Sequence, residues 1–203
     1  MRRPTQTALK AERRLRGSPE ETRARLVAAA AELFNRDGYL GTDSVRIARA
    51  AGYASGTFYK HFADKRAALL AAYESWVTAE WRAVAEEVAA GGTTRELAER
   101  VVRLVLDLHV RWRGLRAALA TLLATDAEAR RFHRDQRRRQ LEMMSAQRRR
   151  RGKRSRAAEE DAVLLFTLER TCDAVAGGEL RDLSLDRDAT LAVLRRLLEE
   201  ALE

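Results

Sequence analysis

Cysteine and proline are almost absent from this chain of 203 residues. The single cysteine, Cys172, excludes an internal disulfide and any cysteine-based metal site. Pro4 and Pro19 both lie near the N-terminus, and the rest of the chain is rich in Ala, Leu, Arg and Glu, which favour helices. No apolar run approaches the roughly 20 residues that cross a bilayer. We therefore expect an all-α protein of the cytoplasm, with no membrane span and no signal peptide.

Catalytic patterns are missing as well. The three histidines, His61, His109 and His133, are scattered without the spacing of metal ligands. There is no glycine-rich phosphate loop, and no Ser, His and acidic residues stand in a recognisable nucleophile setting. We expect no enzymatic activity, no cofactor and no metal.

The net charge of +9 is concentrated in two segments. Residues 1–17 carry six Lys or Arg against Glu12, and residues 130–156 carry thirteen against Asp135 and Glu142. The remainder of the chain is therefore negative. Basic patches of this kind attract polyanions and steer their approach.

Each basic segment has more than one interpretation. Residues 1–17 are expected to form a flexible arm, which either follows DNA or has no role. Residues 130–156 fit a solvated helix face with a basic loop, the mouth of a pocket for an anionic ligand, or a further nucleic-acid surface.

Capping residues, glycines and apolar spacing predict the helices. Ser18, followed by Pro19 and by Glu21, marks a helix start, and Thr93, Asp64 and Asp126 are similar caps. The expected helices cover about residues 19–37, 43–51, 55–62, 65–90, 94–113, a short stretch through 119–122, 127–150, 156–176 and the segment from 186 onward.

Residues 47–59 have the layout of a helix, a sharp turn and a second helix. Ala48 is small where two helices would cross, and Gly52 lies where a chain leaving a helix often needs a positive φ. Apolar residues that would fix the angle between the two helices are Ile47, Ala51, Tyr53 and Phe58. This unit on a basic chain predicts a helix-turn-helix that places one helix in the major groove of DNA.

At these residues the chain resembles the tetracycline-repressor (TetR) family of bacterial regulators. The matching positions are Leu33-Phe34, Gly38-Tyr39, Thr42, Ile47-Ala48, Ala51-Gly52, Gly56-Thr57-Phe58-Tyr59, His61-Phe62 and Lys65. The resemblance covers about the first third of the chain and departs at Ser44, where the family usually has an apolar residue. It implies a three-helix DNA-binding head at 18–64 on a helical ligand-binding and dimerisation domain at 65–203.

The DNA contacts are expected mainly on residues 55–62. The polar side chains of Ser55, Thr57 and Lys60 would face away from the apolar side of that helix. Gly56 lacks a side chain, which lets the backbone approach the groove. The resemblance implies backbone contacts from Tyr59, His61 and Lys65, base contacts from Ser55, Gly56 and Thr57, and further contacts from Thr42 and Arg46. Packing for Tyr59, a structural role for His61 and plain solvation for Arg46 stay open.

The larger domain is expected to hold an apolar ligand site and a dimer face. Candidate ligand contacts, each of which also fits plain core packing, are Trp76, Trp81, His109, Trp112, Phe132, Met144, Phe166 and Cys172. Helices at about 157–177 and 186–202 would pair across a homodimer, unless they form internal core. The predicted function is a ligand-responsive repressor that binds a palindromic operator; a non-specific architectural DNA-binding protein is the alternative.

Overall fold

The computed structural model describes residues 18–152 and 156–203, so the expected arm at 1–17 lies outside the described residues. Every regular element in these ranges is helical, which confirms the all-α prediction. The helices are α2 (Pro19–Asp37), α3 (Ser44–Ala50), α4 (Ser55–Tyr59), α5 (Lys65–Ala89), α6 (Thr94–Arg111), α7 (Arg113–Thr125), α8 (Ala127–Arg150), α9 (Ala158–Gly177), α10 (Glu179–Asp182) and α11 (Arg187–Leu202).

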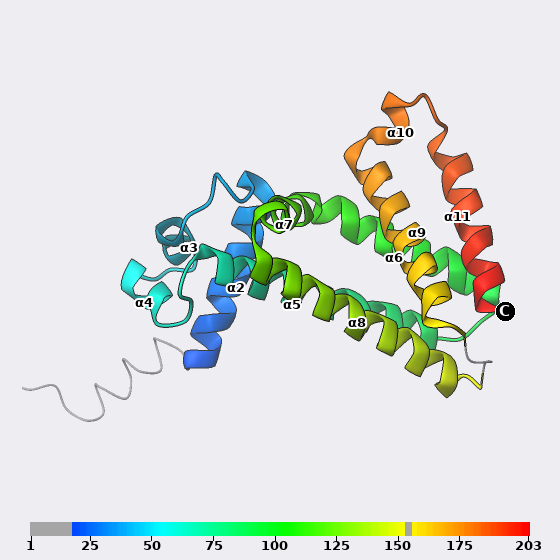
Figure 1. Cartoon of the computed structure of the whole chain (residues 1–203), viewed down its shortest axis with the longest axis horizontal. Coiled ribbons are helices and arrows are strands. Elements are labelled where there is room, and N and C mark those ends of the chain that lie inside the picture. Colours follow the sequence, from blue (N-terminus) through cyan, green and yellow to red (C-terminus); the bar gives the residue numbers. More distant parts are fainter. Residues whose placement is uncertain (1–17, 153–155) are drawn as a thin grey trace, which may run out of the picture.

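The molecule is elongated, with α2, α3 and α4 at one end and α9, α10 and α11 at the other (Figure 1). Between the ends run α5 and α8, which contact each other. At 25 residues α5 spans about 37 Å. It begins six residues after α4 ends, so one helix connects the small helical head to the far end of the body.

The predicted helix starts are confirmed by their caps. The hydroxyl of Ser18 accepts a hydrogen bond from the Glu21 amide at 3.1 Å, and the Glu21 carboxylate accepts one from the Ser18 amide at 2.8 Å. Thr93 and Glu96 form the same reciprocal box at the start of α6. Asp64 caps α5 in a similar way, with 2.8 Å from its carboxylate to the Ala67 amide. These local signals place the starts of α2, α5 and α6, whereas the short helix α10 was not predicted.

Gly114 lies in the first turn of α7, directly after the end expected for the helix at 94–113. A Cβ at this position would come within 1.8 Å of the backbone oxygen of Asn35 at the end of α2. The side chain of Asn35 also bonds the Arg111 carbonyl and the Leu115 amide. The glycine therefore permits close packing of α2 on the start of α7.

Two buried clusters form the core. In the first, head residues such as Phe34 and Phe58 pack together with Leu69 of α5 and Leu115 of α7. The second joins α6, α9 and α11 around the buried Cys172. The predicted boundary at 64/65 coincides with the start of α5, but the first cluster continues across it. The head is therefore packed directly against α5 and α7.

Candidate nucleic-acid interface and ligand cavity

The turn between α3 and α4 has the geometry of a helix-turn-helix. Gly52 adopts a φ of +82°, as its position after α3 predicted. The Tyr53 amide donates to the carbonyl of Ala48 at 2.9 Å, which closes the end of α3. Ile47, Ala48 and Phe58 are fully buried between the two helices. This packing holds α4 at a fixed angle on the head.

The outer face of α4 is largely exposed to solvent. Ser55, Gly56 and Lys60 are exposed and Thr57 is half-buried. A Cβ built on Gly56 would meet no atom within 4 Å, so packing inside the protein does not require glycine there. The predicted reading face thus points outward, and its smooth centre allows another molecule to approach the backbone.

Tyr59 is held in place by the residue at which the sequence departs from the TetR pattern. Its hydroxyl lies 2.8 Å from the hydroxyl of Ser44 at the start of α3, and its ring packs edge-on against Phe58. The side chain remains 57% exposed. Ser44 therefore orients a phenol at the surface between α3 and α4, a role that was not predicted for it.

Thr42 and Lys65, both predicted to contact DNA, have their polar groups bonded within the protein. Thr42 is 1% exposed, and its hydroxyl donates to the carbonyl of Gly38 at 2.9 Å. The ammonium of Lys65 donates to the carbonyls of Tyr39 and Thr42, both at 2.9 Å, and lies over the Tyr39 ring. Both residues therefore stabilise the turn between α2 and α3, and a contact of either with DNA stays a prediction.

Arg46 also serves this turn. Its guanidinium lies 2.5 Å from the carboxylate of Asp37 and bonds the carbonyl of Gly41. Hydrogen bonds from Arg36, followed by Arg46, lower the pKa of Asp37 to about 2. The side chain of Arg46 is 43% exposed, so a contact with DNA stays a prediction, as it does for the half-buried His61.

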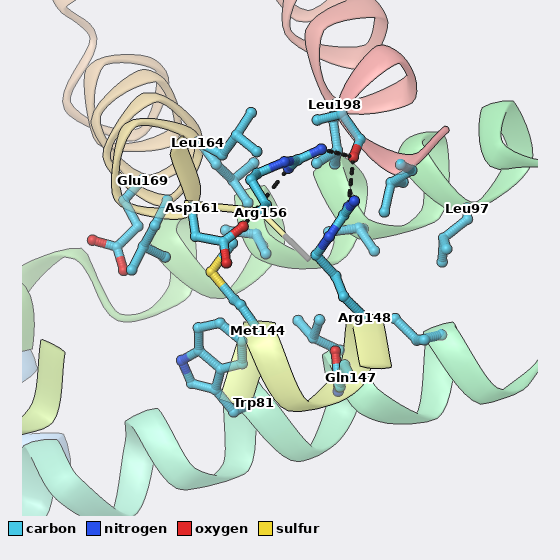
Figure 2. A pocket seen from close by; sticks show the side chains of 18 of the residues that line it. Trp81, Leu97, Met144, Gln147, Arg148, Arg156, Asp161, Leu164, Glu169 and Leu198 are labelled. Carbon is cyan, nitrogen blue, oxygen red and sulfur yellow. Dashed lines mark hydrogen bonds and ion pairs between the residues drawn. The ribbon is translucent and has the colours of Figure 1, made fainter. Parts of the chain in front are cut away.

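A cavity of about 130 Å³ lies in the far half of the body, among α5, α6, α8, α9 and α11 (Figure 2). Most of its wall is aliphatic: Val84, Val88, Leu97, Val101, Val105, Leu164, Leu165, Leu168, Leu198 and Leu202. Polar groups concentrate where α8 ends and α9 begins. There, Arg148 and Arg156 both bond the carbonyl of Ala201 near the end of α11, and Asp161 lies beside Arg156. A small apolar molecule with one polar group suits this space.

Only two of the predicted ligand residues, Trp81 and Met144, line this cavity. Phe166 is 51% exposed on the outside of α9. The remaining candidates are core or network residues that apolar spacing cannot separate from a cavity wall: Trp76, Trp112 and Phe132 pack in or against the first core cluster, Cys172 lies in the second, and His109 is part of a buried ionic network.

The cavity residues that were not predicted include the aliphatic side chains of the wall and several polar groups. Arg148 and Arg156 belong to the arginine-rich segment, for which a pocket mouth was one interpretation. Asp161 is an acidic residue on the inner side of an apolar helix, which is the signal that could have singled it out. Its burial depends on packing between helices distant in sequence, which the sequence alone does not reveal.

The buried ionic network is centred on Asp173 of α9. Its carboxylate lies 3.0 Å from Nδ1 of His109 and 2.7 and 2.6 Å from the Arg116 guanidinium. Nε2 of His109 is 3.5 Å from Glu80 of α5, which also lines the cavity. Burial opposes charge at both partners, but the hydrogen bonds prevail: the pKa of His109 is raised and that of Asp173 is lowered. The network joins α5, α6, α7 and α9.

The arginine-rich segment divides between structural and solvated residues. Arg137 points inward and pairs with Glu169 of α9, 2.5 Å from Nη1 to Oε1. Arg148 and Arg156 hold the end of α11, as described above. The exposed members in the described part of the segment are Arg130, Arg131, Arg134, Arg138, Arg139, Arg149, Arg150 and Arg151. A solvated basic face therefore accounts for much of the segment.

Exposed apolar side chains gather on the two helices expected at the dimer face. Val163 and Phe166 of α9 are 63% and 51% exposed, and Val193 and Leu197 of α11 are 46% and 43% exposed. The same helices bury Leu165, Cys172, Leu191 and Leu194 against the body. Each helix thus has an inner apolar face that is covered and an outer one that is not.

Residues 18–152 and 156–203 contain no group of three or more His, Cys, Asp or Glu arranged to hold a metal ion. No helix in these ranges is both long and apolar enough to cross a membrane.

Residues 26–72 match the family model described as bacterial regulatory proteins, tetR family. The match covers the C-terminal part of α2, all of α3 and α4, and the first part of α5. No curated protein is significantly similar to the chain in sequence.

The whole fold is similar to that of solved bacterial regulators. A putative TetR-family transcriptional regulator from Mesorhizobium loti superposes with a TM-score of 0.70 at 16% identity, over 92% of this chain and 96% of that one. A putative transcriptional regulator from Saccharomonospora viridis in complex with choline gives 0.64 at 22%, over 89% and 95%. FadR from Bacillus subtilis in complex with stearoyl-CoA gives 0.59 at 20%, over 88% and 96%.

Proposed function

We propose that this TetR-family protein, whose residues 26–72 match the family model and whose fold resembles that of putative TetR-family regulators, is a repressor that binds a palindromic operator as a homodimer. A DNA target places its action in the cytoplasm, and no enzymatic step forms part of the proposal. The observation that carries it is α4, a short helix fixed by buried packing on one side and left open on the other.

The open face of α4 has the groups that a reading helix needs. Ser55, Thr57 and Lys60 offer donors, and Gly56 lets the backbone come close to base edges or phosphates. Tyr59 and His61 lie at the end of α4, where they would contact the DNA backbone. Thr42, Arg46 and Lys65 support this face by holding the turn between α2 and α3.

A palindromic operator requires two copies of α4 at a fixed spacing. The uncovered apolar faces of α9 and α11 support a homodimer in which these helices from two chains pack as a four-helix bundle. Because α9 and α11 lie at the end of the molecule opposite the head, the dimer would leave both α4 helices free (Figure 1).

The cavity supports control by a small-molecule effector. Trp81, Val84 and Val88 of its wall belong to α5, whose first turn follows the head directly. A ligand that favours a different tilt of α5 would change the spacing of the two α4 helices and with it operator affinity. Effectors of differing chemistry occur in this fold, since the similar structures hold stearoyl-CoA and choline.

Selection of bound genomic fragments by the purified protein, followed by footprinting, tests this function. A specific repressor protects a short palindrome with half-sites about one helical turn, or a multiple, apart. Binding without sequence preference that falls steeply with salt would instead support the architectural alternative, in which the basic segments make the contacts.

A further inference from the structure

Asp161 is a carboxylate buried at the wall of an apolar cavity, and one of its two oxygens lacks a hydrogen-bond partner. The residue is 2% exposed, and its Oδ1 is shielded from solvent without a hydrogen-bond partner. The nearest cation is Arg156, whose Nη1 lies 3.7 Å away, beyond hydrogen-bond distance. A buried charge without hydrogen bonds is costly, so this site favours a ligand that supplies a donor.

Several other charged groups of the cavity have partners of their own. Glu169 pairs with Arg137, and Glu80 faces His109 in the buried network. Arg148 and Arg156 both donate to the carbonyl of Ala201 at the end of α11. An anionic ligand would have to compete with that carbonyl and would approach the Asp161 carboxylate as well. Arg148, Arg151 and Arg156 line the same end of the cavity, but the oxygen of Asp161 that lacks a partner can be satisfied only by a donor, and a cationic group is the strongest one.

Two further features agree with a cation at this position. Burial raises the pKa of Asp161 even though Arg156 and Arg148 act in the opposite direction, so the two arginines do not fully compensate for the buried charge. In the wall, Trp81 provides an indole, the aromatic group that attracts cations best. Met144 also lines the cavity and adds a polarisable apolar contact.

We propose that the cavity binds a hydrophobic amine, with the apolar body among the Val and Leu side chains and the protonated amino group donating to the carboxylate of Asp161. This inference rests on the proposed function for its regulatory meaning, because it names the class of effector. The chemistry of the site itself does not depend on DNA binding. The long aliphatic wall between α5 and α11 would accept a straight or branched hydrocarbon chain.

Three probes of equal length test the proposal: octylamine, octanol and octanoate. Titration calorimetry on the full chain measures the affinity for each probe, below the concentration at which the probes aggregate. Octylamine should bind at least about ten-fold more tightly than octanoate. Asp161→Asn should lower the affinity for octylamine by about ten-fold and leave octanol within about two-fold. The Trp81 fluorescence change on binding, absent in Trp81→Phe, would locate the probe in the cavity.

Glu159→Gln is the matched control, since Glu159 is an exposed acidic residue on the same helix. It should leave all three affinities unchanged. The proposal would be overturned if octanoate bound most tightly, if the unaltered protein bound all three probes equally, or if it bound none of them. It would also be overturned if a folded Asp161→Asn variant bound octylamine normally. Amine binding without release of operator DNA would contradict the effector role under "Proposed function" while leaving the cavity chemistry in place.

Discussion

At the scale of single residues, Gly114 and Gly56 occupy helices in opposite surroundings. A Cβ on Gly114 would overlap the backbone oxygen of Asn35, whereas a Cβ on Gly56 would meet nothing within 4 Å. The first glycine is explained by packing inside the protein. The second is left without a structural reason, and a close approach by DNA supplies one.

Gly114→Ala should destabilise the protein. The overlap with Asn35 is with backbone, which has no flexible side chain to move aside, so α2 and α7 must separate. We expect a loss of about 1–3 kcal/mol in the free energy of unfolding, as is typical of overpacking. Urea denaturation measures it, and an unchanged midpoint would show that α7 shifts freely against the head.

Gly56→Ala should leave the protein at least as stable and weaken its binding to the operator. Alanine favours a helix over glycine by about 1 kcal/mol, so stability should be equal or higher. Operator affinity should fall by about ten-fold or more, since the methyl group would keep α4 from the groove. Fluorescence anisotropy on the footprinted operator measures this, and full affinity in the stable variant would remove the close approach from the proposal.

The sequence predicts only in part which polar residues of the head are exposed. The exposed positions of α4 follow from helix periodicity once Phe58 is placed inside. The sequence could not show that the side chains of Thr42 and Lys65 are bonded within the protein. Their partners are backbone carbonyls of a turn whose path depends on the packing of α2, α3 and α5. The contact of Ser44 with Tyr59 joins residues 15 apart and required the structure.

At the scale of elements, the Asp173 network connects four helices through charge, so its contribution depends on pH. Below its ordinary pKa of 6.5, His109 is protonated and its raised pKa stabilises the fold; that part is lost as pH rises through the raised value. The lowered pKa of Asp173 stabilises the fold above its ordinary 3.8, and that part is lost as pH falls below it. The network is strongest between these limits.

Asp173→Asn should therefore destabilise the protein most between about pH 4 and 6.5. We expect a loss of about 2 kcal/mol near pH 5.5, less than for a fully buried pair because the Asp173 side chain is 39% exposed and partly screened by water. Thermal unfolding from pH 3 to 9 measures the difference from the unaltered protein. Asp107→Asn, on an exposed site of α6, is the control and should show no such maximum. A difference that grows steadily toward pH 9 would contradict the role of protonated His109.

Helices could be predicted well from the sequence, whereas the cavity could not. Caps such as Ser18 with Glu21 are contacts within three residues of each other, and the sequence contains them completely. The cavity is enclosed by helices that start at residues 65, 94, 127, 158 and 187, and its wall depends on how they pack. Aromatic residues with suitable spacing were therefore assigned to it although most of them fill the core.

At the scale of the whole molecule, the head lies at one end and the uncovered apolar faces of α9 and α11 lie at the other (Figure 1). Helix α5 runs from the head toward that far end. A stable homodimer buries about 1,200 Å² or more in total. Val163, Phe166, Val193 and Leu197 give α9 and α11 the apolar centre that such an interface requires.

Val163→Glu should therefore separate the dimer without unfolding the chain. The side chain is 63% exposed in the single chain, so a carboxylate there is solvated in the monomer but would be buried and unpaired in the four-helix bundle. Analytical ultracentrifugation at micromolar concentration should give two chains for the unaltered protein and one for the variant. Operator affinity should fall by about 100-fold or more, because one head contacts only one half-site.

Val110→Glu is the control. It replaces a valine that is 53% exposed on α6, outside both helices, and this variant should remain dimeric. A dimer that survives Val163→Glu and dissociates with Val110→Glu would place the interface on α6 instead, and the two α4 helices would then need a different spacing on DNA.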